Sequence, residues 1–236
     1  MLRIEGLTKT YADKIAVKDL HLHIQPGEIF GFIGHNGAGK TTTLKACCGI
    51  LPFDKGEIYI AGHSIRQEPL LCKQNLAYLP DNPDLYEFLT GIQYLNFVAD
   101  VYGVSKADRV KRIQAFGERL GMTDDLSLPL SDCSHGMRQK VALIGALIHQ
   151  PKLILMDEPF VGLDPVASHQ LKQVMAQHCA QGGAIFFSTH VLEVAEKLCH
   201  KVAIIKNGSL VAAGTMEDVR GNASLEQVFL GLEGQV

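Results

Sequence analysis

The sequence predicts an α/β protein: a three-layer core with a mainly parallel sheet, an antiparallel β portion near the N-terminus and an inserted helical subdomain. Strand-like apolar runs alternate with helical segments early in the chain and again after residue 151, an order typical of parallel sheets covered by helices. Between these parts, residues 91–102 and 105–120 carry helical spacing, which predicts a helical insertion over residues 84–150. Apolar residues make up 47% of the chain, which suits an ordinary α/β core.

The chain of 236 residues is long enough for one large domain with a subdomain inserted. We expect a single domain over residues 1–236, in which residues 1–83 and 151–236 form the core and residues 84–150 form the helical subdomain. The net charge is −3 and no long basic run occurs, so nucleic acid is not an expected partner.

Nothing in the sequence predicts a membrane span or a disulfide framework. No apolar stretch reaches the ~18 residues that would cross a bilayer, and the first residues lack the apolar core of a signal peptide. The six cysteines form no C-x-x-C pair, so we expect reduced, buried thiols rather than disulfides or a metal site. These features favour a cytoplasmic protein.

Strands are expected over residues 1–34. Leu20, Leu22 and Ile24 alternate with His21 and His23, with the period of two that a half-buried strand shows. Two histidines at this spacing could ligate a metal. No third ligand is evident, and a solvated strand face is the favoured interpretation.

A glycine-rich loop follows the apolar run of residues 29–33 and precedes a helix expected over residues 42–48. Glycines let backbone N–H groups approach a polyphosphate, and the helix N-terminus attracts its charge. The loop matches the phosphate-binding pattern G-x-x-x-x-G-K-[ST] in its strand–loop–helix setting; it reads Gly34-His35-Asn36-Gly37-Ala38-Gly39-Lys40-Thr41.

This loop predicts a nucleotide site, because a chance glycine turn would not have these flanking elements. Lys40 is expected to reach the β- and γ-phosphates, and the Thr41 hydroxyl to take one position on Mg²⁺. Thr42 belongs to the same expected site.

Further strands are expected at residues 56–62 and 76–79, and helices at residues 91–102 and 105–120. The second of these helices opens with Ser105 and Asp108, which have the spacing of a capping box. Its apolar stripe, spaced for one helix face, consists of Val110, Ile113, Phe116 and Leu120.

From residue 151 the strand–helix alternation resumes. The run Leu153–Met156 predicts a buried parallel strand, and Asp164-Pro165 predicts the start of a helix that continues to about residue 180. The remaining expected elements are a strand at 183–188, a helix from about 191, a hairpin around Asn207-Gly208 and a short helix at 224–232.

Chemically active residues stand at the carboxyl ends of two of these strands, where ligands gather in α/β sheets. Asp157 is the acidic partner expected to hold Mg²⁺, directly or through water. Glu158 could polarise an attacking water, or could be a solvated strand end. His190 ends the next strand on the same edge. A lone histidine is usually structural, but this position favours a role in the site. Because no N-K-x-D motif is present, guanine recognition is not expected.

Together these motifs resemble the ATP-binding subunit of ABC transporters over essentially the whole chain. Residues 34–41 match the family's Walker A loop, residues 153–158 its Walker B strand with the catalytic Glu158, residues 162–164 its D-loop, and His190 its switch histidine. The resemblance implies that Tyr11 stacks on adenine, although the residues alone leave it either a surface ring or a stacking platform. It also implies ATP and Mg²⁺ as ligands.

The chain departs from the family pattern at two places. The signature usually written LSGGQ has Ser134 and Gly136 in place, while His135 replaces a glycine. In the loop after residues 76–79, Asp81 stands where the family usually places a glutamine that reaches Mg²⁺ and water. An aspartate there can hold Mg²⁺ through a water, or it can be a turn residue between two prolines.

The resemblance further implies that two subunits meet head to tail and trap ATP between the phosphate loop of one and Ser134 and Gly136 of the other. The implied partners are transmembrane permease subunits and a second ABC ATPase, identical or different. The stretches YLPxxPxLYxxLT, SHGMRQK and SLEQVF resemble exporter ATPases of the ABC-2 and Ecs type.

Three functions therefore stand open. The first is the ATPase of a membrane exporter, at the inner face of the cell membrane. The second is a soluble ABC ATPase with an assembly or regulatory role. A small-molecule kinase would share the phosphate loop, but it leaves residues 134–136 and His190 without an explanation.

Overall fold

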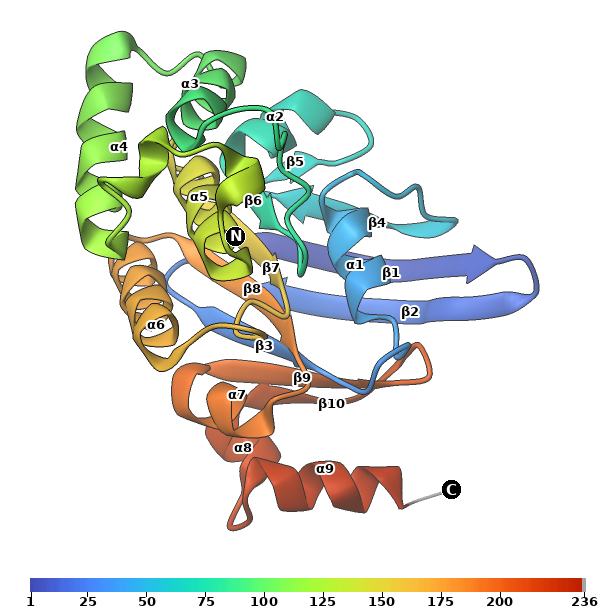
Figure 1. Cartoon of the computed structure of the whole chain (residues 1–236). Helices are drawn as coiled ribbons and strands as arrows, with labels where there is room; N and C mark the ends of the chain where they lie inside the picture. The colour runs from blue at the N-terminus through green and yellow to red at the C-terminus, as the bar shows by residue number, and fades with distance from the viewer. Residues whose placement is uncertain (235–236) are drawn as a thin grey trace.

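The structure, a computed structural model, describes residues 1–234. It contains two β-sheets with helices packed between and beside them (Figure 1). The smaller sheet is antiparallel and has the order β2-β1-β4-β5. Its strands are β1 (Leu2–Tyr11), β2 (Lys14–Ile24), β4 (Lys55–Ile60) and β5 (His63–Ser64).

The larger sheet has the order β10-β9-β3-β8-β7-β6, and all its neighbours are parallel except the hairpin of β9 and β10. The mainly parallel sheet and the antiparallel portion confirm the predicted fold class. The strands are β3 (Ile29–Ile33), β6 (Leu76–Leu79), β7 (Leu153–Asp157), β8 (Ala184–Thr189), β9 (Lys201–Lys206) and β10 (Ser209–Thr215).

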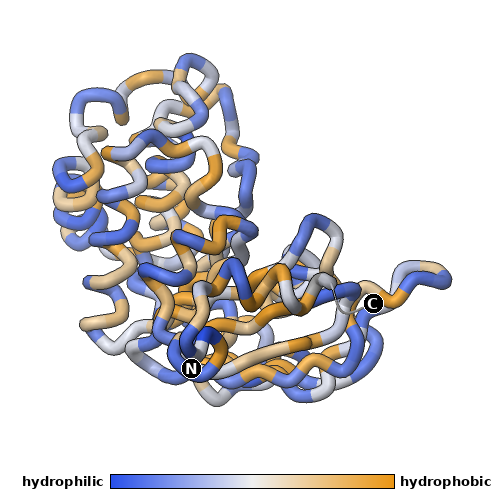
Figure 2. The backbone as a smooth tube through the Cα atoms, turned by 90° about the horizontal axis from the view of Figure 1, so that it is seen from below, coloured by the Kyte–Doolittle hydropathy of each residue, from blue (hydrophilic) through white to orange (hydrophobic). Residues whose placement is uncertain are grey.

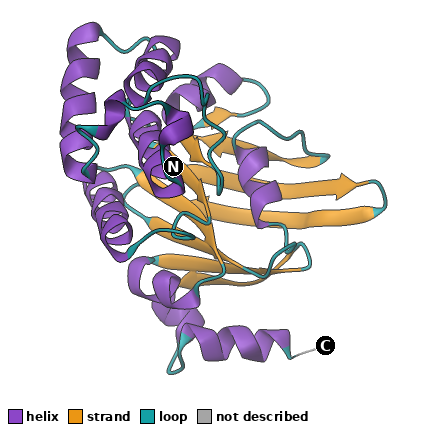
Figure 3. Ribbon diagram, in the orientation of Figure 1, coloured by secondary structure: helices purple, strands orange, loops and turns teal. Residues whose placement is uncertain are grey.

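Helices α3, α4 and α5 pack against one another on one side of the larger sheet, whereas α1 lies on the other side with the antiparallel sheet (Figure 3). Helices α3, α4 and α5 lie in the segment expected to form the helical subdomain. No helix within residues 1–234 is long and apolar enough to cross a membrane. The helices are α1 (Lys40–Cys47), α2 (Pro69–Asn75), α3 (Gly91–Val101), α4 (Lys106–Leu120), α5 (His135–Leu147), α6 (Pro165–Ala180), α7 (Leu192–Leu198), α8 (Met216–Arg220) and α9 (Leu225–Glu233), with short 3₁₀ turns at Asp125–Ser127 and Leu130–Asp132.

The alternation of side chains along each strand divides the interior into two hydrophobic cores. On β3, Phe30 and Phe32 enter a core shared with α1 and the antiparallel sheet, whereas Ile29 and Ile33 enter a core shared with the helical side. Figure 2 shows the resulting hydrophobic strands and the hydrophilic loops around them. The core strands are therefore buried on both faces, as parallel sheets require.

Several local expectations can be compared with the structure. Asp164 accepts hydrogen bonds from the Val166 and Ala167 N–H groups, which confirms it as the N-cap of α6. The predicted capping box of α4 is only partly correct. The Ser105 hydroxyl accepts the Asp108 N–H as predicted, but the Asp108 carboxylate accepts the Ser105 hydroxyl and not the Ser105 backbone N–H.

The predicted apolar stripe of α4 is not buried along its whole length. Ile113 and Leu120 are buried, whereas Val110 is 64% exposed. The α4 face that carries Val110 borders a surface groove toward Ile92 of α3 rather than the core. By contrast, all six cysteines are free and buried, as expected.

The topology places four strand ends beside one another. Since β6, β7, β8 and β3 are adjacent and parallel, their carboxyl ends meet at one edge of the sheet. The phosphate loop, the Asp81 loop, the Asp157-Glu158 pair and His190 leave the sheet there. This edge is where a ligand is expected in such a sheet.

Candidate functional site

The phosphate loop has a shape that only glycine permits at its last turn. Gly39 has φ +112°, and a Cβ on it would lie 2.5 Å from the carbonyl oxygen of Ala16. The loop is also tied to the β9–β10 hairpin, because the Gly208 N–H donates to the Ala38 carbonyl at 2.9 Å. Contacts with Ala16 and with the β9–β10 hairpin therefore fix the loop backbone.

Helix α1 begins at Lys40 with its N-terminus directed to this loop. Gly39 is its N-cap and has no side chain with which to cap the first turn. The first N–H groups of a helix lack partners within the helix, and they attract anions. The start of α1 therefore presents donors to a phosphate group.

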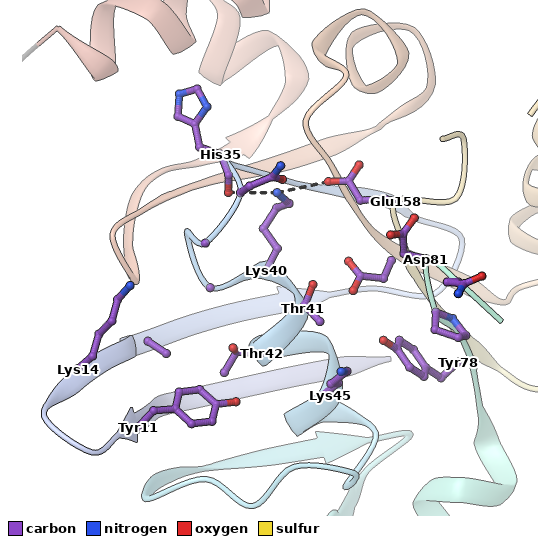
Figure 4. A pocket seen from close by; sticks show the side chains of 17 residues that line it. Tyr11, Lys14, His35, Lys40, Thr41, Thr42, Lys45, Tyr78, Asp81 and Glu158 are labelled. Carbon is purple, nitrogen blue, oxygen red and sulfur yellow. Dashed lines mark hydrogen bonds and ion pairs between the residues drawn. The ribbon is translucent and has the colours of Figure 1, made fainter. Parts of the chain in front are cut away.

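Lys40 is held inside the loop rather than in solvent. Its ammonium donates to the carbonyls of Gly34 at 2.6 Å and His35 at 3.3 Å, and it lies 3.3 Å from Oε1 of Glu158 (Figure 4). The Lys40 side chain is only 6% exposed. These oxygens accept the hydrogen bonds that the Lys40 ammonium would otherwise donate to a polyphosphate. Nucleotide binding therefore requires Lys40 to exchange partners.

A cavity of about 520 Å³ opens in front of the loop and α1. Tyr11 lies at one end of it, half-exposed, with the Lys9 ammonium 5.2 Å from the ring centroid. Glu158 lies at the other end (Figure 4). The predicted site residues that line the cavity are Tyr11, His35, Asn36, Gly37, Gly39, Lys40, Thr41, Thr42, Asp81, Asp157 and Glu158.

The residues present fit a magnesium ion held together with phosphate oxygens. The Thr41 hydroxyl and the Asp157 carboxylate line the same cavity and are the hard oxygen ligands that Mg²⁺ prefers. Residues 1–234 contain no group of three His, Cys, Asp or Glu side chains that could hold a metal alone. A metal here would therefore complete its shell with the nucleotide and water, as Mg²⁺ usually does.

Asp157 is oriented by the neighbouring strand. It is 4% exposed, and its Oδ1 accepts a short hydrogen bond from the Ser188 hydroxyl of β8. Ser188 is also paired with Asp157 in the sheet register. The carboxylate is thus fixed at the strand end, where it can face a ligand.

Glu158 has an unusual backbone conformation. Its φ is +48°, which is uncommon for a residue with a side chain. Its N–H lies 3.0 Å from the Ser188 hydroxyl and 3.2 Å from the Ser188 carbonyl oxygen. Such strained residues cluster at functional sites, because the surrounding structure must hold them.

The Glu158 side chain is 12% exposed and contacts the Lys40 ammonium and the His190 ring. Oε1 faces Lys40, while Oε2 lies 3.0 Å from Nδ1 of His190 and accepts the His190 backbone N–H at 3.2 Å. This arrangement connects the phosphate loop, β7 and β8. It can hold a carboxylate in a fixed direction beside the cavity.

Other predicted residues lie outside the cavity lining. Gly34 and Ala38 form the buried underside of the loop, and His190 contacts the site through Glu158. Ser134 and Gly136 lie at the start of α5, where exposed Ser134 accepts the Met137 N–H at 3.3 Å as an N-cap. The signature is therefore not part of the same cavity within one copy of the chain.

Some cavity residues were not predicted from the sequence. Lys45 follows Thr41 by one helical turn, a spacing that could have placed it on the same face. For Tyr78, burial near Asp157 raises the pKa well above its ordinary range. The unpredicted lining residues are Lys14, Ala16, Lys45, Tyr78, Pro80 and Asn82.

A phosphate loop at the end of β3, followed by a helix N-terminus and facing a buried strand-end aspartate, defines a P-loop ATPase. More narrowly, the chain belongs to the ABC transporter family, whose sequence pattern it matches over residues 17–161. It is therefore an ATP-binding subunit of a transporter, and its enzymatic activity is ATP hydrolysis.

Individual relatives agree with this assignment. The linearmycin resistance ATP-binding protein LnrL of Bacillus subtilis is 34% identical over 93% of this chain and 70% of its own length. The ABC-type transporter ATP-binding protein EcsA of the same organism is 34% identical over 98% of this chain and 96% of its own. A solved ATP-binding subunit of an ABC transporter is 35% identical over 99% of both chains, with a TM-score of 0.94.

Proposed function

We propose that the chain powers a membrane exporter through an ATP-bound dimer in which each site uses residues of both copies. The observation that carries this proposal is the separation of two half-sites. Lys40, Glu158 and His190 are connected beside the phosphate loop. Ser134 is exposed at the start of α5 and does not line that cavity.

The cavity residues divide the work of nucleotide binding. Tyr11 stacks on the adenine ring, and the loop N–H groups of residues 34–41 surround the phosphates. Lys40 leaves the Gly34 and His35 carbonyls for phosphate oxygens, which are stronger partners because they are charged. Thr41 and Asp157 would hold Mg²⁺, which supplies charge neutralisation at the phosphates, with Asp81 in its outer shell.

Glu158 orients and polarises the water that attacks the terminal phosphate. When Lys40 turns to the phosphate, Oε1 of Glu158 loses its cationic neighbour and becomes available to accept a proton from water. His190 keeps the carboxylate in place through Oε2. The contact between Lys40 and Glu158 therefore has to separate before Glu158 can act as the base.

The second copy completes the site from the opposite side. Ser134 and the first N–H groups of α5 offer donors to the γ-phosphate in trans, in the way a second protein supplies an arginine finger elsewhere. The His135 ring lies against Gly162, since a Cβ there would meet the ring at 3.4 Å. The signature is thus packed beside residues 162–164 of its own copy.

A surface near the site suits docking of a permease. Tyr86 contacts Phe88 and Phe97 at ring-centroid distances of 5.9 Å and 5.7 Å, and all three rings are exposed. A cavity of about 310 Å³ beside α3 shares Tyr78 and Pro80 with the nucleotide cavity. A transmembrane subunit bound there would contact the loop that carries Asp81, and would keep the chain at the cytoplasmic face of the membrane.

The proposed direction of transport is outward. The name of LnrL describes resistance to linearmycin, a role compatible with moving a compound outward. Purification of the chain from gently solubilised membranes tests the whole proposal. We expect a transmembrane subunit to co-purify and to raise the ATPase rate. A chain recovered only from the soluble fraction, with full activity alone, would support the assembly or regulatory role instead.

A further inference from the structure

Tyr78 carries a hydroxyl that the structure leaves without a hydrogen bond. The oxygen is buried, and no residue in the described range 1–234 bonds to it. A buried polar group without a partner costs stability, so such a group calls for an explanation. The ring lines the nucleotide cavity and points from β6 toward the side of α1 (Figure 4).

The sheet places Tyr78 and Asp157 on the same face. Tyr78 is paired with Leu155 in the parallel register of β6 and β7. Leu155 and Asp157 are two residues apart on β7, so their side chains point to the same side of the sheet. Tyr78 and Leu155 both belong to the core that α1 covers, the helix that carries Thr41.

Asp157 receives a donor from only one of its two flanking strands. Ser188 of β8 donates to Oδ1. On the opposite side β6 is the neighbour, and Tyr78 is the hydroxyl that it presents on this face. Carboxylates that hold metals are usually hydrogen-bonded by such outer partners, which fix their direction.

We propose that Tyr78 is a positioning residue whose hydroxyl donates a hydrogen bond to the Asp157 carboxylate when metal and nucleotide occupy the site. A phenol is a neutral donor at physiological pH, as this role requires. Tyr78 from β6 and Ser188 from β8 then hold Asp157 from both sides. This inference rests on the proposed nucleotide and metal site.

The test compares Tyr78→Phe with the parent protein by titrating Mn²⁺ in the presence of ADP and following the free ion by EPR. The variant keeps the ring and removes only the hydroxyl, so we expect the Mn²⁺ affinity to fall about three- to tenfold. ADP affinity in EDTA should not change. Tyr94→Phe, in the neighbouring cavity, is the matched control and should bind Mn²⁺ with the affinity of the parent protein.

Thermal unfolding without ligand separates a positioning role from a structural one. Since the hydroxyl has no partner in the free protein, Tyr78→Phe should unfold at the parent temperature or above it. Failure of the variant to fold, a lower unfolding temperature without ligand, or a parent-like Mn²⁺ affinity would each overturn the inference. If the parent bound no Mn²⁺ with ADP, the proposed metal site itself would fail.

Discussion

Nδ1 of His190 lies 3.0 Å from Oε2 of Glu158, and the same oxygen accepts the backbone N–H of His190 at 3.2 Å. Glu158 and His190 directly follow the neighbouring strands β7 and β8, and Glu158 has a positive φ. The contact directs one carboxylate oxygen to His190 and leaves the other facing Lys40. If Glu158 activates the attacking water as proposed, the oxygen that faces Lys40 is the one available to it.

This contact predicts the effect of His190→Ala. Loss of a hydrogen bond to a charged group costs about 1.5–3 kcal/mol. If this hydrogen bond holds Glu158 in its direction in the transition state, its loss should lower ATP turnover roughly 10- to 100-fold. ATP affinity should change little, because His190 does not line the cavity. Turnover and nucleotide binding are measured on the same preparation. His21→Ala, on an exposed strand face, is the control, and equal turnover in both variants would contradict the role of His190.

The trans arrangement predicts the oligomeric state. The chain should be largely monomeric without nucleotide, and ATP should trap a dimer of Glu158→Gln. Adding Ser134→Arg should abolish that dimer while ATP still binds the monomer, because Ser134 lies outside the cavity. Light scattering after size exclusion gives the mass. Ser127→Arg, another exposed serine of the helical region, should leave the dimer intact. A dimer that forms without nucleotide would count against the arrangement.

Asp81 is predicted to affect Mg²⁺-dependent ATP turnover rather than the affinity for ATP. It lines the cavity from the loop after β6, where a carboxylate can hold Mg²⁺ through a water. Asp81→Ala should leave ATP affinity within a few-fold and lower turnover at limiting Mg²⁺, most clearly with the permease bound.

The control for Asp81 is Asp84→Ala. Asp84 belongs to the same loop but lines the neighbouring cavity, so its removal should not change the apparent Mg²⁺ affinity. Parent-like turnover of Asp81→Ala at limiting Mg²⁺ would make Asp81 a turn residue only.

Much of this site could be predicted from the sequence because its chemistry depends on neighbours along the chain. The phosphate loop, the apolar strand before Asp157 and the N-cap Asp164 are local patterns, and strand order then brings the phosphate loop and Asp157 to one edge of the sheet. The fold class followed from the same alternation of strands and helices.

Other features depend on distances that no local pattern records. The contact of Lys40 with Glu158 arises because β3 and β7 both flank β8, which brings the loop after β3 close to the end of β7. The unpartnered hydroxyl of Tyr78 requires the register of β6 against β7. Val110 lies on the predicted apolar face of α4 but borders a surface groove instead. Periodicity predicts which residues share a face, not what covers that face.

Glu158 is predicted to activate the attacking water without being required for ATP binding. The most direct test measures ATP binding and ATP turnover on one preparation of Glu158→Gln, which keeps the side-chain shape and removes the base. We predict near-normal ATP binding and a fall in turnover of about 10²-fold or more. Lys40→Ala should instead lose binding, since it removes a phosphate counter-charge. Hydrolysis by Glu158→Gln at the parent rate would contradict the account.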